Sequence, residues 1–117
     1  MIIKDSIQIE EAIASLLTRD FVISLKKEDF EKYCPNPSLA FHYEADNAAY
    51  AVQKLKTEFA ADAGPFKCIV LYINGYDFTV GELYDIGHAL PQHAMVRRAI
   101  SKSSPDYGKL EIWLFAN

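Results

Sequence analysis

The most constraining feature of this chain is an apolar run near its middle. Residues 66–73 read FKCIVLYI, and every residue from Ile69 to Ile73 is apolar. A strand with one face in water alternates apolar and polar residues, whereas a strand covered on both faces can be apolar throughout. The run is far shorter than the roughly 20 apolar residues that a membrane span needs. The pattern therefore predicts a central strand in a sheet that is covered on both sides.

Alternating patterns predict further strands. They occur at residues 20–26 (DFVISLK), at residues 39–43, and at residues 109–115 (KLEIWLF) near the C-terminus. In the last of these, one face carries Leu110, Ile112 and Leu114, and the other carries Glu111, Trp113 and Phe115. The pair Asn74-Gly75 is a strong signal for a tight turn, so residues 76–78 could return as a short hairpin arm.

Helical spacing of apolar residues predicts helices over about residues 6–18 and over a short segment, residues 27–34. Residues 38–63 fit two readings, a strand followed by a helix or one long helix. We favour strand and then helix, because aromatic residues at alternate positions suit a pleated surface. Asp46 or Asn47 would then cap the helix.

The segment FTVGELYDIGHALPQHAMVRR, residues 78–98, predicts two helices in succession. Thr79 and Glu82 have the spacing of a capping box, in which each side chain bonds the backbone N–H of the other residue. Pro91 cannot sit inside a helix, so it is expected to begin the second one. The second helix would bury one side and expose the other: Met95, Val96, Ala99 and Ile100 inside, and Arg97, Arg98 and Ser101 outside.

These elements predict an α+β fold, with a single mixed or antiparallel sheet of four to five strands and helices packed on it. The length of 117 residues suits one domain, residues 1–117, with a core that needs no metal or disulfide. The strand order does not follow from the pattern.

Composition narrows the classes of function. The net charge of -4, from 16 acidic and 12 basic residues, argues against free nucleic acid as a partner, because phosphate contacts need clustered Lys and Arg. The start of the chain lacks the pattern of a secretory signal, so we expect a cytoplasmic protein and no membrane association. Cys34 and Cys68 match no metal or redox spacing and are expected to be reduced thiols. We expect no cofactor.

The strongest candidate for function is an acidic, aromatic surface. Between Cys68 and Val96 there is no Lys or Arg, although several acids and tyrosines lie there. Such a surface suits a basic protein partner. We therefore expect a small protein-binding domain, such as an inhibitor or immunity-type protein that blocks a toxin, nuclease or other basic protein; self-association is also open. The expected contact residues are Tyr76, Asp77, Glu82, Tyr84, Asp85 and His88. The competing reading is structural, with Tyr76 closing the turn and Tyr84 flanking the core.

The alternative function is a small metal- or histidine-dependent enzyme that uses Asp85, His88 and His93, with His42 as a further ligand. Asp85 and His88 would share one helical face. However, the two histidines are five residues apart and separated by Pro91, which is not the four-residue step of a zinc helix. The chain also lacks a nucleophile elbow and a phosphate loop. We therefore favour binding over catalysis and assign no catalytic or metal-binding residue.

Overall fold

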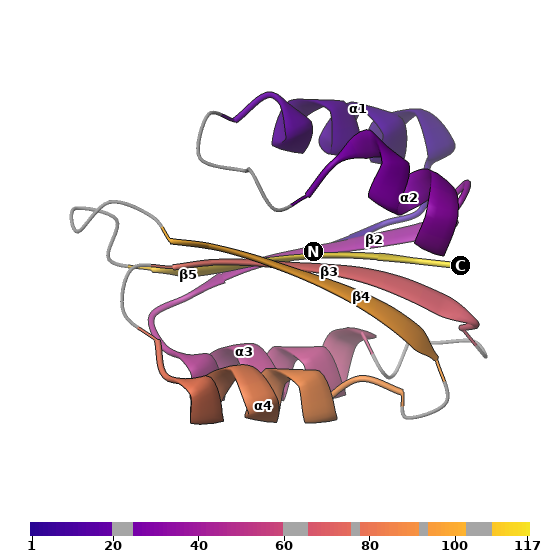
Figure 1. Ribbon diagram of the computed structural model, residues 1–117. Helices are drawn as coiled ribbons and strands as arrows, with labels where there is room; N and C mark the ends of the chain where they lie inside the picture. Colours follow the sequence, from indigo (N-terminus) through magenta and orange to yellow (C-terminus); the bar gives the residue numbers. More distant parts are fainter. Residues whose placement is uncertain (20–24, 60–65, 76–77, 92–93, 103–108) are drawn as a thin grey trace.

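The computed structural model describes residues 1–19, 25–59, 66–75, 78–91, 94–102 and 109–117. Its centre is one five-stranded sheet with helices on both faces (Figure 1). The strands are β1 (Ile2–Ile3), β2 (Leu39–Ala45), β3 (Cys68–Gly75), β4 (Met95–Lys102) and β5 (Leu110–Ala116), in the spatial order β1-β2-β5-β3-β4. Thus the predicted α+β fold with a single sheet is confirmed.

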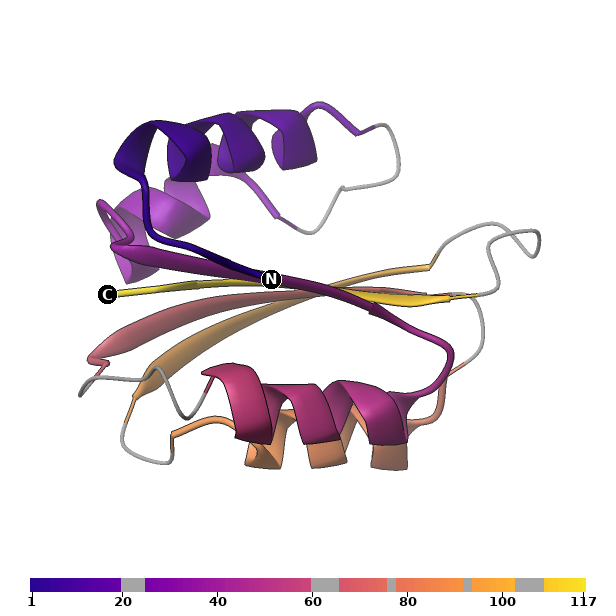
Figure 2. The same cartoon turned by 180° about the vertical axis from the view of Figure 1, so that it is seen from behind.

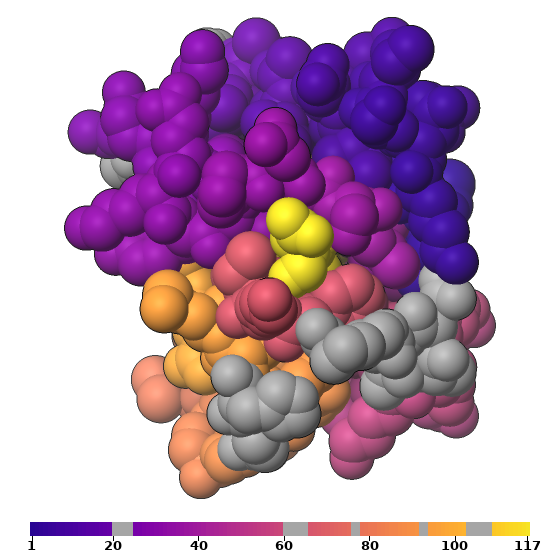
Figure 3. Space-filling view, turned by 90° about the vertical axis from the view of Figure 1, so that its right-hand side faces the viewer, coloured from indigo at the N-terminus to yellow at the C-terminus, as the bar shows by residue number. Residues whose placement is uncertain are grey.

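The sheet is mixed. The C-terminal strand β5 lies in its middle and runs antiparallel to both of its neighbours, β2 and β3. β1 adds to β2 in antiparallel fashion at one edge, and β4 adds to β3 in parallel at the other edge. Seen from the side, the C-terminus of the chain, just after β5, reaches the surface between the two helical layers (Figure 3).

Helices cover both faces of the sheet (Figures 1 and 2). α1 (Ser6–Leu17) and α2 (Lys27–Tyr33) lie on one face. On the other face lie α3 (Ala48–Lys54), which continues as a π-helical turn, η1 (Leu55–Phe59), and α4 (Val80–His88). None of the described helices has the length and apolar composition that a membrane span requires.

The two-sided cover explains the apolar sequences of β3 and β5. Leu71 and Ile73 pack toward α3 and α4, while Val70 and Tyr72 pack toward α1 and α2, and all four are buried. β5 divides in the same way, with Leu110, Ile112 and Leu114 on the first side and Trp113 and Phe115 on the second. The predictions for both strands are confirmed.

The ambiguous stretch is a strand followed by a helix, as we favoured. The side chain of Asn47 accepts a hydrogen bond from the backbone N–H of Tyr50 at 3.1 Å, which caps α3. All of β2 is paired with β5, from Leu39 opposite Ala116 to Ala45 opposite Leu110. This pairing satisfies the backbone groups that a longer helix would otherwise have used.

The prediction of a second helix after Pro91 is wrong, because Met95–Lys102 forms strand β4. Its eight residues pair with β3 in parallel along the full length of that strand, so pairing outweighs the local helical spacing. Met95 is 62% exposed and Ile100 is 41% exposed, although both were expected inside. Neighbouring arginines point to opposite faces of the sheet: Arg97 bonds Asp29 of α2 at 3.2 Å, while Arg98 lies against Gly87 of α4.

The predicted tight turn at Asn74-Gly75 is also wrong, because both residues belong to β3. Gly75 is required for space and not for a left-handed backbone. A Cβ there would lie 2.9 Å from the side chain of Leu110 and 2.9 Å from that of Phe78. Two further predicted elements, the strand at residues 20–26 and the hairpin arm at residues 76–78, fall largely outside the described residues.

We therefore expect a Gly75→Ala variant to lose about 1–3 kcal/mol of unfolding free energy, since an overpacked site must shift its neighbours. Urea unfolding measures this loss. The control is Gly81→Ala on α4, where the nearest atom to an added Cβ is Thr79 Oγ1 at 3.8 Å. That variant should be neutral or slightly stabilising, because alanine is the better helix former. Equal stability of the two variants would contradict the packing role of Gly75.

The two cysteines lie side by side, although the sequence separates them by 34 positions. Cys34, after α2, is buried, and its Sγ is 3.2 Å from Sγ of the half-buried Cys68 in β3. Burial, reinforced by the neighbouring Cys68 thiol, raises the pKa of Cys34. The two cysteines do not form a disulfide in this structure.

A thiol oxidant such as diamide should join Cys34 and Cys68 within one chain, because the sulfurs need to approach by only about 1 Å to reach bonding distance. Diamide takes up the two electrons and two protons that the thiols release. Alkylation under denaturing conditions, read by mass spectrometry, should then fall from two modified cysteines to none. Oxidation that instead joins two chains, or that leaves Cys34 open to alkylation, would contradict this contact.

Candidate functional site

The predicted surface centres on α4, whose start is the expected capping box. Thr79 Oγ1 accepts a hydrogen bond from the backbone N–H of Glu82 at 3.1 Å, and Glu82 Oε1 accepts one from the backbone N–H of Thr79 at 2.9 Å. Glu82 is therefore held at the helix start. Its charge also lies where the helix dipole favours an anion.

The outer side of α4 exposes apolar surface. Val80 is 84% exposed and Tyr84 is 65% exposed. The ring of Tyr84 packs against the imidazole of His88, with the ring centroids 4.0 Å apart. Asp85 is exposed beside them. A large aromatic side chain held in place on a helix surface is a typical anchor in protein interfaces.

A groove runs between α3 and α4, with a volume of about 530 Å³. Its apolar part comes from α3, and α4 contributes the acids. The lining residues are Asn47, Ala48, Ala49, Val52, Lys56, Glu82, Asp85 and His88. The structure thus brings Glu82, Asp85 and His88 together on one groove, with Tyr84 beside them. Tyr76 and Asp77, the other two predicted contact residues, lie outside the described residues.

A second groove, of about 550 Å³, lies between α1, α2 and residues 35–38. Its charges balance, because Lys4 and Lys27 offset Glu10 and Glu31. In the groove between α3 and α4, two acids face the single cation Lys56. The second groove therefore has the size of a binding surface but not the acidic character.

The alternative metal set receives no support from the described residues. Within that part of the chain, one group brings His and carboxylate atoms close enough together to hold a metal. This group is His42, Glu44 and Glu111, and it does not include Asp85 or His88. His93 lies outside the described residues, so the set of Asp85, His88 and His93 stays a prediction.

A polar cluster that was not predicted from the sequence surrounds Glu111, on the sheet face covered by α1 and α2. The Glu111 side chain is only 4% exposed. Its carboxylate accepts hydrogen bonds from Arg19 at 2.5 and 3.2 Å, from His42 Nε2 at 2.9 Å and from Trp113 Nε1 at 3.3 Å. Burial alone would raise the pKa of Glu111, but the hydrogen bonds from His42 and Arg19 and their charges outweigh burial and hold that pKa at about 2.

The cluster extends across the sheet as a row of polar residues. In β2, β5, β3 and β4 the row is Glu44, Glu111, Asn74 and Ser101, each in register with the next. Tyr72 lies two residues before Asn74 in β3, so the two side chains are on the same face of the sheet. Within the described part of the chain, three buried atoms of this group make no hydrogen bond of good geometry: Tyr72 Oη, Asn74 Oδ1 and Ser101 Oγ. Burial raises the pKa of Tyr72, although the nearby side chains of Ser101 and Arg19 oppose this rise.

One sequence signal could have pointed to this cluster. Glu111 shares its strand face with Trp113 and Phe115, and a carboxylate between aromatic residues in a buried strand needs partners. The partners themselves are distant in sequence. Arg19 is 92 positions away and His42 is 69 positions away, so only the fold brings them together.

Comparison with protein-family models and with curated proteins finds no match. Among solved structures, the chain is similar to an FtsZ dimer from M. jannaschii, with 17% identity and a TM-score of 0.62 over 92% of this chain. It is similar to an FtsZ mutant from the same organism at 17% identity and a TM-score of 0.61 over 95% of this chain. The matches cover only 35% and 37% of those FtsZ chains. At this identity the likeness shows a shared fold and nothing about activity.

Proposed function

We propose that this protein works by binding another protein through the outer surface of α3 and α4, and that the partner presents a basic side chain to the groove. The observation that carries the proposal is the 65% exposed Tyr84, held against His88 beside an acid-lined groove. An inhibitor or immunity-type protein that covers a basic site on its target fits this surface.

Burial of the exposed apolar groups would supply the binding energy. Val80 and Tyr84 on α4 are the most exposed of the large apolar residues described. Removing such surface from water contributes about 25 cal/mol per Å². Tyr84 can add a hydrogen bond through its hydroxyl, which is why tyrosine is common in interface centres.

The acids would supply orientation. Glu82 and Asp85 line the groove between α3 and α4, and Lys56 is the single lysine or arginine of that lining. A Lys or Arg of the partner would meet both carboxylates, and the overall charge of -4 would attract a basic protein over a longer range. Electrostatic attraction of this kind raises the association rate more than the final affinity.

Self-association is the competing use of the same surface. One of the similar solved structures is described as an FtsZ dimer. A second copy of this acidic chain would place acids against acids unless its basic strand β4 took part, so we favour a different, basic partner. Light scattering of the purified protein should therefore show a monomer.

The test compares two variants in affinity capture from the native host. The first, Tyr84→Ala with Asp85→Lys, alters the proposed surface and leaves Glu82 in its capping box. The control, Ile7→Ser with Glu10→Lys, makes matched changes on α1, where Ile7 is 64% exposed. A true partner is retained by the wild type and by the control but not by the first variant.

The purified partner then gives the affinity. We expect the α4 variant to lose about 2 kcal/mol of binding free energy, which raises its Kd roughly 30-fold. This is the typical effect of removing a central interface residue. Circular dichroism must show that both variants keep the fold. Unchanged affinity of the α4 variant, or loss of binding in the α1 control instead, would refute the proposed surface.

A further inference from the structure

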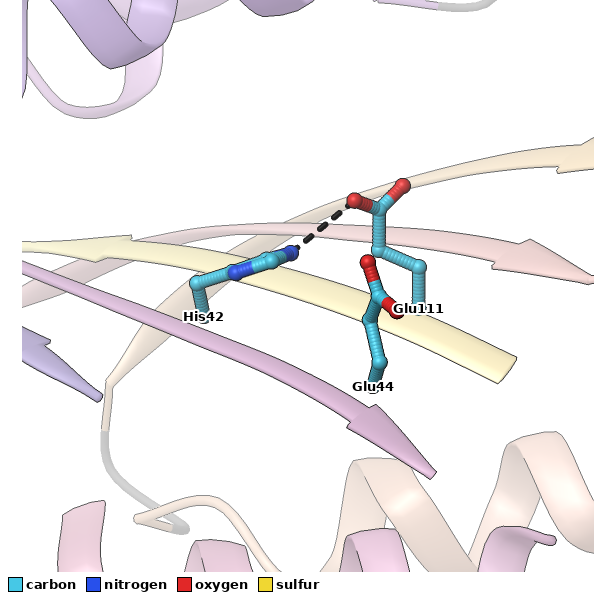
Figure 4. Close-up of side chains that lie close together, drawn as sticks. All are labelled: His42, Glu44 and Glu111. Atoms are coloured by element: carbon cyan, nitrogen blue, oxygen red, sulfur yellow. Dashed lines mark hydrogen bonds and ion pairs between the residues drawn. The ribbon is translucent and has the colours of Figure 1, made fainter. Parts of the chain in front are cut away.

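We propose that His42, Glu44 and Glu111 form a binding site for a divalent transition-metal ion such as Zn²⁺, separate from the protein-binding surface. Each residue offers one ligand atom, and these atoms all lie within 4.8 Å of one another. Figure 4 shows His42 and Glu44 projecting from β2 toward Glu111 of β5. One imidazole nitrogen and two carboxylate oxygens make a ligand set that suits Zn²⁺, with a position left for water.

The backbone places these ligands. His42 and Glu44 are two residues apart on one strand, so their side chains leave the same face of the sheet. Glu111 is the register partner of Glu44 on β5. Side chains directly opposite one another in antiparallel strands have Cβ atoms about 5 Å apart. The site therefore depends on the rigid middle of the sheet and not on a loop.

The charges favour a cation. Glu44 and Glu111 bring two negative charges and Arg19 brings one positive charge, so these three side chains together are negative by one unit. Glu111 Oε1 accepts the 2.5 Å hydrogen bond from Arg19, while Oε2 faces His42 Nε2 at 2.9 Å. A metal ion bound to His42 Nε2 and Oε2 would replace the hydrogen bond between these two atoms, while the Arg19 contact would keep the carboxylate oriented.

The site has an open side and a polar buried side. Glu44 is exposed and the His42 side chain is 22% exposed, so an ion can approach from there. On the other side of Glu111 lies its register partner Asn74, which is 2% exposed and whose Oδ1 has no hydrogen-bond partner among the described residues. In folded proteins nearly all buried polar atoms are paired, and exceptions often accompany a bound water or ion.

Isothermal titration of the full chain with ZnCl₂ at neutral pH tests the proposal. We expect one Zn²⁺ per chain, and no binding of Mg²⁺, which prefers a shell of oxygen ligands only. Glu44→Gln should weaken Zn²⁺ binding roughly tenfold or more, and His42→Ala should weaken it further. Glu44→Gln keeps the size of an exposed side chain, so this variant should fold. It therefore tests the site even if the His42→Ala variant does not fold.

The matched control is Asp85→Asn with His88→Ala, which removes the other His and carboxylate pair of the described chain and should leave Zn²⁺ affinity unchanged. Cys34→Ser with Cys68→Ser should also bind normally, which excludes the adjacent thiols as the site. The proposal is overturned if wild-type protein binds no Zn²⁺, if Glu44→Gln binds as tightly as wild type, or if either control loses the ion.

Discussion

At neutral pH, a Glu111→Ala variant is expected to lose about 3 kcal/mol of unfolding free energy. The change removes the acceptor for Arg19, His42 and Trp113 at once, and it removes the carboxylate that neutralises the partly buried guanidinium of Arg19. Breaking a buried ion pair from one side typically costs about 3–5 kcal/mol. The lower figure applies because the Arg19 side chain is 29% exposed and can recover some hydration.

The matched control is Glu44→Gln, which alters the exposed register partner of Glu111 on β2. It should change the stability by no more than about 0.5 kcal/mol, as for most surface substitutions. Urea unfolding in the presence of a chelator, which removes any metal contribution, measures both variants. A loss below about 1 kcal/mol for Glu111→Ala would mean that the carboxylate network contributes little to the fold.

The same comparison has a defined dependence on pH. The pKa of Glu111 lies at about 2 in the folded protein, against 4.5 as its ordinary value. A lowered pKa stabilises the fold fully above the ordinary value, and the stabilisation is lost as the carboxylate is protonated. The stability difference between wild type and Glu111→Ala should therefore be constant above about pH 4.5 and shrink as the pH falls from there toward 2. A difference unchanged across that range would contradict the lowered pKa.

A second large effect is expected on the opposite face of the sheet, where Phe59→Ala should cost about 4 kcal/mol. Phe59 ends the π-helical turn and is fully buried. Its ring lies between Phe66, stacked at 5.3 Å, and Phe41 of β2, at 6.2 Å. Removal of the middle ring leaves a cavity and ends both aromatic contacts, each worth about 0.5–1.5 kcal/mol beyond the buried area.

Two further variants separate this packing effect from a change in helix propensity. Phe59→Leu should lose less, about 1–2 kcal/mol, because it fills most of the volume. Tyr50→Ala removes an aromatic residue of α3 that is 55% exposed, and it should change stability by less than about 0.5 kcal/mol. Thermal and urea unfolding measure all three. Similar losses for Phe59→Ala and Tyr50→Ala would contradict the assignment of Phe59 to the core.

Features with a local cause could be predicted from the sequence. The apolar run at Ile69–Ile73 predicts a strand covered on both faces, and the spacing of Thr79 and Glu82 predicts a helix start. In each case the neighbouring residues contain the reason, which is burial on both sides for the strand and hydrogen bonding of the first helical turn for the cap.

Features that depend on distant partners could not be predicted in this way. Residues 95–102 have helical spacing, but pairing with β3 makes them a strand. The Asn74-Gly75 pair is a turn signal, yet it is held in β3 by register with Glu111 and Ser101. The cluster around Glu111 joins residues of four separate strands and Arg19, which follows α1, and these segments are far apart in the sequence.

The central claim is that the surface of α3 and α4 binds a basic protein partner. Hydrogen–deuterium exchange of the protein, alone and in complex with the captured partner, tests this claim most directly. We expect slower exchange in the complex over Val80–His88 and Ala48–Lys54, with exchange of Ser6–Leu17 on the opposite face unchanged. Protection confined to Ser6–Leu17, with α4 exchanging at the same rate in both states, would contradict the claim.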